Sequence, residues 1–421
     1  MTDMTIEMLD NKAREILRGN DRGGYTLPTA GLYPYQWNWD SAFAAWGFTN
    51  FDVPRAWQEL ETLFTGQWPN GMVPHILFHQ PDPGYFPGPD VWGTDGIGPI
   101  ASSGISQPPV AATFARSVFM ADPEQGKPHL EVLFPKLIAW HRWFMRWRND
   151  NGAIFITHPW EGGRDNAPDW DSAMSAIDPV GVGEYVRRDT THVDSSMRPT
   201  KEDYDRYIWL VQRGRRLGWD DAIMAEDAPF RVADPLMTFV LLRANRDLAA
   251  VADILGEDRS EIDAWSTQIE AGAQSLRNDD GVFDGVNLNL GSHTGSVSSA
   301  SFLCWYAGIE SAVMMKELHA AFEACAYPVP SQKVGSEWFD SRRYWRGPTW
   351  GMLNSLIAMG LSDMGHHDEA ETLRERTRNL MAEKGFAEYY DPLSGAPAGG
   401  GTFTWTAAVW LTWASPSAGD E

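Results

Sequence analysis

The stretch Arg148-Asn-Asp-Asn-Gly152-Ala-Ile-Phe155 decides the fold, because a helical pattern stops there, a glycine follows and a short extended run begins. Glycine just past a helix suits the left-handed conformation in which many helices end. The same arrangement returns at residues 68–73, 277–283 and 383–387, each time after a helical segment. A unit that recurs in this way is typical of repeat-built folds. It predicts helical hairpins that turn at one rim of a ring, and we expect six of them.

Helical periodicity dominates the rest of the chain, and the period-two alternation of strands is scarce. The expected helices span residues 3–19, 40–49, 54–66, 108–121, 128–148, 202–217, 234–254, 258–276, 298–307, 312–325, 350–363, 368–383 and 404–414. No strand–helix–strand rhythm appears, and no segment resembles a linker between domains. The prediction is a mainly α toroid of helical hairpins that forms one domain over residues 1–421.

Composition and charge narrow the possible partners. The net charge of −23 disfavours nucleic acid and anionic membrane surfaces. The chain shows neither the basic and apolar start of a signal peptide nor an apolar run long enough to span a membrane. Its two cysteines suit a reducing compartment. We therefore expect a cytoplasmic protein that binds neither nucleic acid nor membrane, and a homo-oligomer is compatible with the sequence.

Aromatic residues and two long irregular segments indicate where a ligand would bind. The chain has 21 Trp, and indole rings stack well on the apolar faces of sugars, although Trp also fills protein cores. Residues 79–107 are dense in Gly and Pro, and residues 157–200 are polar and aromatic. Structureless segments of this length inside a domain are usually functional. We expect both to be active-site loops around a closed pocket for a small carbohydrate.

Two carboxylic acids stand out as candidates for proton transfer. Inverting hydrolysis of a glycoside needs one carboxylic acid to protonate the leaving oxygen and one carboxylate to activate water, about 6.5–9.5 Å apart. Asp165 lies in a loop among indoles, where burial would keep a carboxyl group neutral unless the side chain of Arg164 points toward it. Glu388 follows the last of the recurring glycines. The alternatives are a turn or cap residue for Asp165 and an ordinary exposed residue for Glu388.

Three clusters that mix aromatic with polar residues precede expected helices. They lie at residues 33–41, 344–350 and 402–406. Each cluster could be aromatic core, but burying Asn, Asp and Arg among rings is costly, which favours cavity walls. Asp40 could alternatively be a helix N-cap.

Four blocks of sequence together resemble one known family. They are Gln36-Trp-Asn-Trp-Asp-Ser41, Trp160-Glu-Gly-Gly-Arg-Asp-Asn166, Tyr344-Trp-Arg-Gly-Pro-Thr-Trp350 and Phe386-Ala-Glu-Tyr-Tyr-Asp-Pro392. In this order they resemble glycoside hydrolase family 63, which includes processing α-glucosidases and bacterial mannosylglycerate and glucosylglycerate hydrolases. The resemblance extends over residues 30–410, and the length of the chain is most similar to that of the glycerate-sugar hydrolases.

The resemblance implies an (α/α)6 barrel and an inverting mechanism, with Asp165 as general acid, Glu388 as general base and Asp40 as a ligand of the sugar. It implies further contacts to sugar or leaving group by Tyr33, Tyr85, Gln107, Tyr344 and Trp345. The predicted substrate site is completed by Trp37, Trp39, Trp160, Glu161, Arg164, Arg346, Trp350 and Trp405. The run Gly162-Gly163-Arg164 departs from relatives that have Ser-Gly and an apolar residue, which bears on substrate choice rather than on the reaction.

The expected substrate is glucosylglycerate or mannosylglycerate. Arg346 is the first candidate to hold the glycerate carboxylate, with Arg164 and Arg198 as alternatives. Another small α-linked glucoside is the alternative substrate. A sugar epimerase or isomerase would need pairs of histidines in the cleft, and a non-catalytic sugar-binding toroid would not need the two acids.

No cofactor and no metal is expected. The spacing of His75 and His79 is that of helical metal ligands, but these residues lie in an extended run, where their rings need not converge. The glycine-rich run at residues 96–101 has no strand before it, so it is not a dinucleotide-binding loop.

Overall fold

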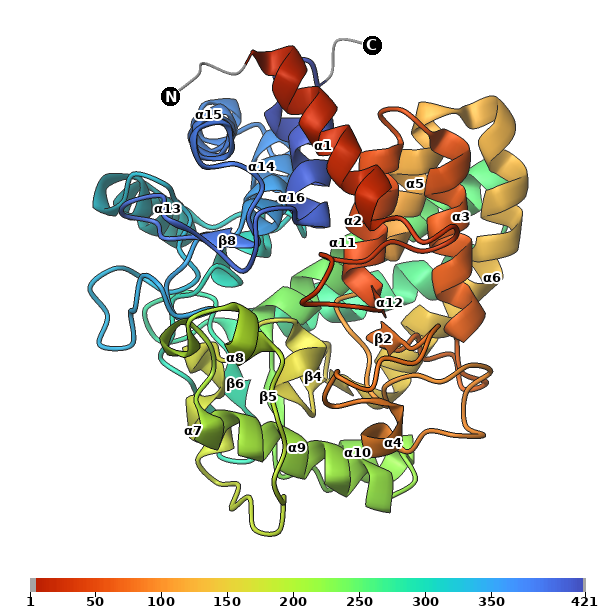
Figure 1. Ribbon diagram of the computed structural model, residues 1–421, viewed down its shortest axis with the longest axis vertical. Helices are drawn as coiled ribbons and strands as arrows, with labels where there is room; N and C mark the ends of the chain where they lie inside the picture. Colours follow the sequence, from red (N-terminus) through yellow and green to blue (C-terminus); the bar gives the residue numbers. More distant parts are fainter. Residues whose placement is uncertain (1–4, 419–421) are drawn as a thin grey trace.

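Outer and inner elements alternate along the chain in the computed structural model, which describes residues 5–418 (Figure 1). The outer helices are α1 (Ile6–Asn20), α3 (Val53–Leu63), α6 (Pro123–Trp147), α12 (Ser260–Ala273), α13 (Ala312–Ala324) and α15 (His367–Lys384). The inner elements are α2 (Asn38–Phe48), α5 (Ala111–Ala121), α11 (Pro235–Leu255), the 3-10 turn η6 (Ser301–Cys304), α14 (Gly351–Asp363) and α16 (Thr404–Val409).

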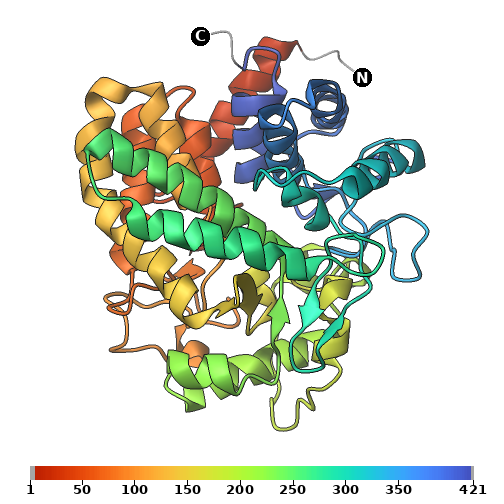
Figure 2. The same ribbon diagram turned by 180° about the vertical axis from the view of Figure 1, so that it is seen from behind.

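The inner elements form a closed ring. Each one contacts the next in the order α2, α5, α11, η6, α14 and α16, and α16 returns to contact α2. The outer helix α1 packs against α16, and α12 runs beside α11 on the far face of the molecule (Figure 2). The predicted toroid is therefore confirmed for the described residues. Five of its six hairpins pair two helices, and the remaining one pairs α12 with the turn η6.

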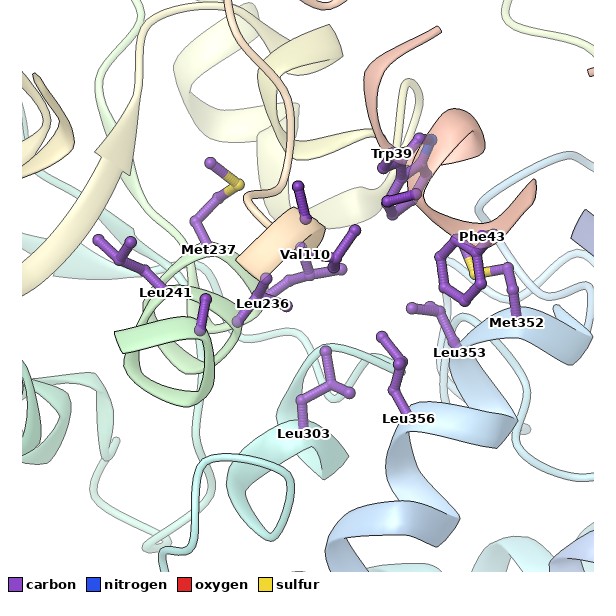
Figure 3. Packing of buried hydrophobic residues seen from close by; sticks show 14 of the residues in the cluster. Trp39, Phe43, Val110, Leu236, Met237, Leu241, Leu303, Met352, Leu353 and Leu356 are labelled. Carbon is purple, nitrogen blue, oxygen red and sulfur yellow. The ribbon is translucent and has the colours of Figure 1, made fainter. Parts of the chain in front are cut away.

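Burial separates the two layers as the sequence pattern requires. Every residue of α2 is buried, whereas the buried residues of α15 form one stripe along the helix. A helix that is apolar all round belongs inside a protein, and an amphipathic one covers its surface. Figure 3 shows side chains of the inner elements, among them Phe43, Leu236, Leu303 and Leu353, converging on one apolar centre.

The recurring glycines all have the positive φ angle that was predicted, but at Gly385 the ψ angle of −164° is extended and not left-handed helical. The φ angles are +100° at Gly71, +99° at Gly152, +78° at Gly281 and +81° at Gly385. At Gly152 a Cβ atom would also lie 2.1 Å from the carbonyl oxygen of Gln268 in α12, so only glycine fits there. Short extended runs follow these turns and form small antiparallel sheets, one of them in the order β3-β4-β5-β6-β7.

The remaining elements are short, apart from the 16-residue helix α9. The helices are α4 (Pro89–Trp92), α7 (Asp171–Met174), α8 (Asp189–His192), α9 (Lys201–Arg216) and α10 (Asp221–Glu226), and the single turns are η1 (Phe64–Gly66), η2 (Pro159–Gly162), η3 (Pro168–Trp170), η4 (Ser195–Met197), η5 (Gln274–Leu276) and the π-helical η7 (Trp410–Ala414). The strands are β1 (Gln36–Trp37), β2 (Ile76–Leu77), β3 (Asn149–Asp150), β4 (Ala153–Ile156), β5 (Val232–Ala233), β6 (Val286–Asn287), β7 (Ser292–His293), β8 (Tyr389–Tyr390) and β9 (Pro397–Ala398).

One expected helix is wrong. Residues 298–307 contain only the turn η6, and Gly308 with a φ of +70° follows it. The backbone there lies against α14, where a Cβ atom on Gly360 would fall 2.1 Å from the backbone nitrogen of Tyr306. The backbone of residues 305–306 thus packs directly against α14, and the segment does not continue as an α-helix. The first two residues of the helix expected at 3–19 lie outside the described residues.

The two long segments meet at the end of the molecule opposite α1 (Figure 1). Arg188 forms a two-pronged ion pair with Asp82, with distances of 2.8 and 2.5 Å. The rings of Phe86 and Tyr185 stack with their centroids 4.7 Å apart. Segment 79–107 is thus joined to segment 157–200 by both polar and apolar contacts. None of the helices between residues 5 and 418 is long and apolar enough to cross a membrane.

Candidate active site

A cavity of about 850 Å³ lies where the two long segments meet the N-terminal ends of the inner elements. Both candidate acids line it, and so do many of the residues that were predicted around them. The predicted residues in the wall are Tyr33, Trp37, Trp39, Asp40, Tyr85, Gln107, Trp160, Asp165, Tyr344, Glu388 and Trp405.

Asp165 is exposed to the cavity after the turn η2 and Gly163, whose φ is +66°. The side chain of Arg164 points the other way, with Nη2 2.8 Å from Asp234 and 3.1 Å from Asp169. Burial raises the pKa of Asp165 to about 6, and Asp189 adds to this while Arg198 opposes it. A carboxyl group with this pKa is protonated often enough near neutral pH to donate a proton.

Glu388 is buried, and its Oε1 atom accepts hydrogen bonds from the hydroxyl groups of Tyr33, at 2.9 Å, and Tyr344, at 3.2 Å. Burial raises the pKa of Glu388 to about 7, although Arg198 and both hydroxyl groups lower it. Asp165 is among the groups that raise this pKa, so the two carboxyl groups interact across the cavity. A Cβ atom on Gly399 would lie 2.0 Å from Glu388 Oε2, so the carboxylate needs glycine beside it.

Arg198 is the buried cation of the site, with only 4 % of its side chain exposed. Its Nε donates to Asp189 at 3.1 Å and its Nη2 donates to the Tyr33 hydroxyl at 3.1 Å. The guanidinium carbon lies 3.8 Å from the centre of the Tyr344 ring. Its Nη1 is 3.7 Å from Oε2 of Glu388. The guanidinium group of Arg198 therefore contacts both tyrosines that donate to Glu388 and also lies near Glu388 itself.

The sugar-binding end of the cavity is predicted at Asp40, in the first turn of α2. The N-cap of α2 is Trp37, so the alternative that Asp40 caps the helix is wrong. Burial, followed by the charge of Glu388, raises the pKa of Asp40 well above its usual value. The rings of Trp39 and Trp405 lie beside it in the wall, edge to face at 5.8 Å. The Oε1 atom of Gln107 accepts from the backbone of Trp39 at 3.2 Å, which leaves its amide NH2 group as a donor.

Five residues predicted to bind substrate do not line this cavity, and their assignment is corrected. Glu161 is buried in an ion pair with Arg148 at 2.9 Å, and Arg164 pairs with two aspartates. Arg346 pairs with Asp171 outside the cavity. The rings of Trp345 and Trp350 stack on each other at 3.8 Å behind Tyr344. Two of these residues are thus aromatic core, and the other three are held in ion pairs.

Other wall residues were not predicted. They include His75, Arg188, Asp189 and Tyr204, and also Arg198, which the sequence suggested only as an alternative to Arg346. The charged run Arg187-Arg188-Asp189 within a long loop is the signal that could have pointed to this part of the wall.

The two histidines with metal spacing do not converge. His75 Nδ1 lies 2.6 Å from Ser103 Oγ, and His79 Nε2 lies 2.7 Å from Gln36 Oε1. Among the side chains that the structure describes, no group of three or more His, Cys, Asp or Glu residues could hold a metal ion.

Comparisons with known proteins agree with this geometry. Residues 33–406 match the model of the mannosylglycerate hydrolase MGH1-like glycoside hydrolase domain. The chain is 43% identical to a mannosylglycerate hydrolase of Thermus thermophilus, over 96% of this chain and 99% of that protein. It is 32% identical to a glucosylglycerate hydrolase of Mycolicibacterium hassiacum, over 97% and 98% of the two chains. The structure also superposes on the crystal structure of a family 63 mannosylglycerate hydrolase from a second strain of Thermus thermophilus, in complex with Tris and D-glycerate, with a TM-score of 0.92. The two sequences are 43% identical over 96% of this chain and 99% of that one.

Proposed function

This chain belongs to the mannosylglycerate hydrolase MGH1-like glycoside hydrolases of family 63, and we propose that it hydrolyses a glycoside of glycerate with inversion at the anomeric carbon. The observation that supports catalysis by two acids is the pair Asp165 and Glu388, which line one cavity with raised pKa values. Inversion is supported by the resemblance to family 63. Inverting enzymes keep their two carboxyl groups about 6.5–9.5 Å apart to admit water.

The proposed roles follow from the surroundings of each acid. Protonated Asp165 donates its proton to the glycosidic oxygen as the bond to the anomeric carbon breaks. Glu388 accepts a proton from a water molecule that attacks the opposite face, and the tyrosines on Oε1 orient its carboxylate. Asp40 and the rings of Trp39 and Trp405 hold the sugar. The products are the free sugar, with inverted configuration, and glycerate.

Two guanidinium groups in the cavity wall are candidates to hold an acidic leaving group. Of the three arginines suggested by the sequence, Arg198 alone lines the cavity, and Arg188 lies there as well. Each is paired with an aspartate, Arg198 with Asp189 and Arg188 with Asp82, and keeps further N–H donors. We propose that Arg198 attracts the glycerate carboxylate, with hydrogen bonds from Tyr85, Tyr204 and Gln107. This arrangement explains how a chain of net charge −23 could hold an anionic substrate.

Substrate charge provides the test. Mannosylglycerate and glucosylglycerate are expected to be cleaved with a kcat/KM at least about tenfold higher than neutral glucosylglycerol, because hydrogen bonds to a charged group contribute about 1.5–3 kcal/mol. Sugar release is measured for all three compounds, and NMR of the first product from an α-glycoside is expected to show the β-anomer. Equal kcat/KM values for the acidic and the neutral glycosides would contradict glycerate as the leaving group. An α-anomer as the first product would contradict inversion.

The pH dependence of kcat/KM is expected to be a narrow bell with its maximum at about pH 6.5, midway between the pKa values of about 6 and about 7. Glu388 must be deprotonated, which accounts for the fall in activity on the acid side of the maximum. Asp165 must be protonated, which accounts for the fall on the alkaline side. Because the base has the higher pKa, only a minority of molecules is correctly protonated at any pH. A plateau wider than about two pH units would contradict this arrangement.

The epimerase alternative is disfavoured by the wall of the cavity. Of the histidines that the structure describes, His75 alone lines the cavity, and its ring hydrogen bonds with Ser103. The neighbouring His158 is not in the wall, and its ring nitrogens contact the backbone of Trp160 and Tyr207. We also propose one catalytic domain in the cytoplasm. The family match extends over residues 33–406, and both cysteines, Cys304 and Cys325, are free and buried, as is usual in reducing compartments.

A further inference from the structure

Two buried atoms of opposite charge face each other in the active site without a hydrogen bond. Nη1 of Arg198 and Oε2 of Glu388 lie 3.7 Å apart. Neither atom has a hydrogen-bond partner within the described structure. The guanidinium group of Arg198 therefore stops short of a direct hydrogen bond to the candidate base, and the groups that fix its position decide this distance.

Asp189, at the start of α8, is the group that restrains Arg198 by charge. One of its carboxylate oxygens accepts from Arg198 Nε at 3.1 Å. The same carboxylate accepts from Arg187, through Nε at 3.0 Å and Nη2 at 2.6 Å. Arg187 is itself fixed, because its Nη1 donates to the carbonyl oxygen of Pro199 at 2.8 Å. Asp189 is thus an anion shared by Arg187 and Arg198. Arg187, which does not contact Glu388, fixes the position of this carboxylate.

The gap has a chemical consequence for Glu388. A close ion pair with arginine lowers the pKa of a carboxyl group by about 1–3 units. A base weakened to that extent accepts a proton from water less readily in the transition state. Glu388 has instead a pKa raised to about 7, with burial as the main cause. The distance to Arg198 therefore bears directly on how strong a base Glu388 is.

We propose that Asp189 is a positioning residue that holds Arg198 back from Glu388, so that the base keeps its carboxylate free of a close ion pair. This inference rests on the proposed function, because it assigns Glu388 as the base. Asp189 acts through Arg198, and no contact between Asp189 and the reacting atoms is required.

Other charged and titratable groups surround the two acids. Tyr344 and Tyr389 also contact Arg198, but neither carries the negative charge by which Asp189 restrains the guanidinium group. The Tyr33 hydroxyl also binds Arg198, but it donates to Glu388 as well and carries no charge near neutral pH. Several groups shift the pKa of Glu388 or Asp165, or have their own pKa shifted by one of these acids. They are Tyr33, Asp40, Tyr85, Arg187, Asp189, Arg198, Tyr204, Tyr207, Tyr344 and Tyr389.

Two substitutions are expected to shift the pH profile in opposite directions. In Asp189→Asn, Arg198 closes on Glu388 and Asp165 loses a neighbouring negative charge, so both limbs of the kcat/KM profile move to lower pH by about one unit. The maximal kcat is expected to fall about three- to tenfold, with KM changing less. In Arg187→Gln, Asp189 pairs with Arg198 alone and Asp165 loses a neighbouring positive charge, so both limbs move to higher pH.

Asp171→Asn is the matched control. Asp171 lies in the same long segment and also pairs with an arginine, Arg346, but it does not line the cavity, so its profile should stay unshifted. The profiles are measured on mannosylglycerate and glucosylglycerate, and thermal unfolding of each variant checks that it folds. An Asp189→Asn profile at the wild-type position would overturn the proposal.

If Asp189→Asn does not fold, Arg187→Gln decides, and an unshifted or acid-shifted profile overturns the proposal. Rescue by Asp189→Glu, which restores the charge, is expected to return the limbs toward the wild-type position. Failure of the wild-type chain to release sugar from either substrate would instead sink the proposed function, so the two failures are distinguishable.

Discussion

Asp165→Asn is expected to lower kcat/KM on glycosylglycerates by about 10²–10⁴-fold, because it removes the proton that the leaving oxygen requires. Asparagine has nearly the same shape and the side chain is partly exposed to the cavity, so the variant should fold like the wild type. Asp171→Asn, in the same segment but outside the cavity, is the matched control and should keep its activity.

The leaving group distinguishes this loss from a general defect. Fluoride leaves as an anion without needing a proton, so a glycosyl fluoride of matching configuration should be hydrolysed by Asp165→Asn at a rate much closer to that of the wild type. The variant should also lose the fall in activity on the alkaline side of the maximum, because that fall reflects deprotonation of Asp165. Equal impairment on the fluoride and on the glycerate substrate would mean that Asp165 is not the general acid.

Glu388→Gln is expected to cause a loss of similar size, about 10²–10⁴-fold, on every substrate including the fluoride. The amide can still accept from Tyr33 and Tyr344, but it cannot remove a proton from water. Azide, which attacks without a base, should restore turnover of the fluoride and give a glycosyl azide of inverted configuration.

Glu383→Gln is the control for this second variant, since Glu383 lies on the exposed end of α15 and should tolerate the change. Full activity of Glu388→Gln on the glycerate substrates would exclude Glu388 as the base. An azide product with retained configuration would show instead that the enzyme works through a glycosyl intermediate.

Much of the ring could be predicted from the sequence because its causes are local. The apolar stripe of α15 and the fully buried α2 follow from which residues recur at helical spacing. The turns at Gly71, Gly152 and Gly281 could be placed because the ability to adopt a positive φ angle is a property of glycine itself. The helix expected at residues 298–307 failed for the opposite reason, since the approach of Gly360 is a contact with a distant part of the chain.

The candidate acids were found because family blocks and local surroundings agreed on them, whereas the arginines were not ranked correctly. Arg164 sits beside Asp165 in sequence, yet it pairs with Asp234 from another element. Arg346 follows two predicted wall residues, yet it pairs with Asp171.

By itself, then, the sequence determined the toroid, its glycine turns and the two carboxyl groups proposed for catalysis. Only the tertiary structure decided which guanidinium group faces the cavity, and that Asp189 stands between Arg198 and Arg187. The physical reason is the reach of the interactions. Helical periodicity and turn conformation act over a few residues, but a buried charge must be paired with whichever opposite charge the fold brings near. Arg198 meets Glu388 across a long stretch of intervening chain, and no local pattern specifies that contact.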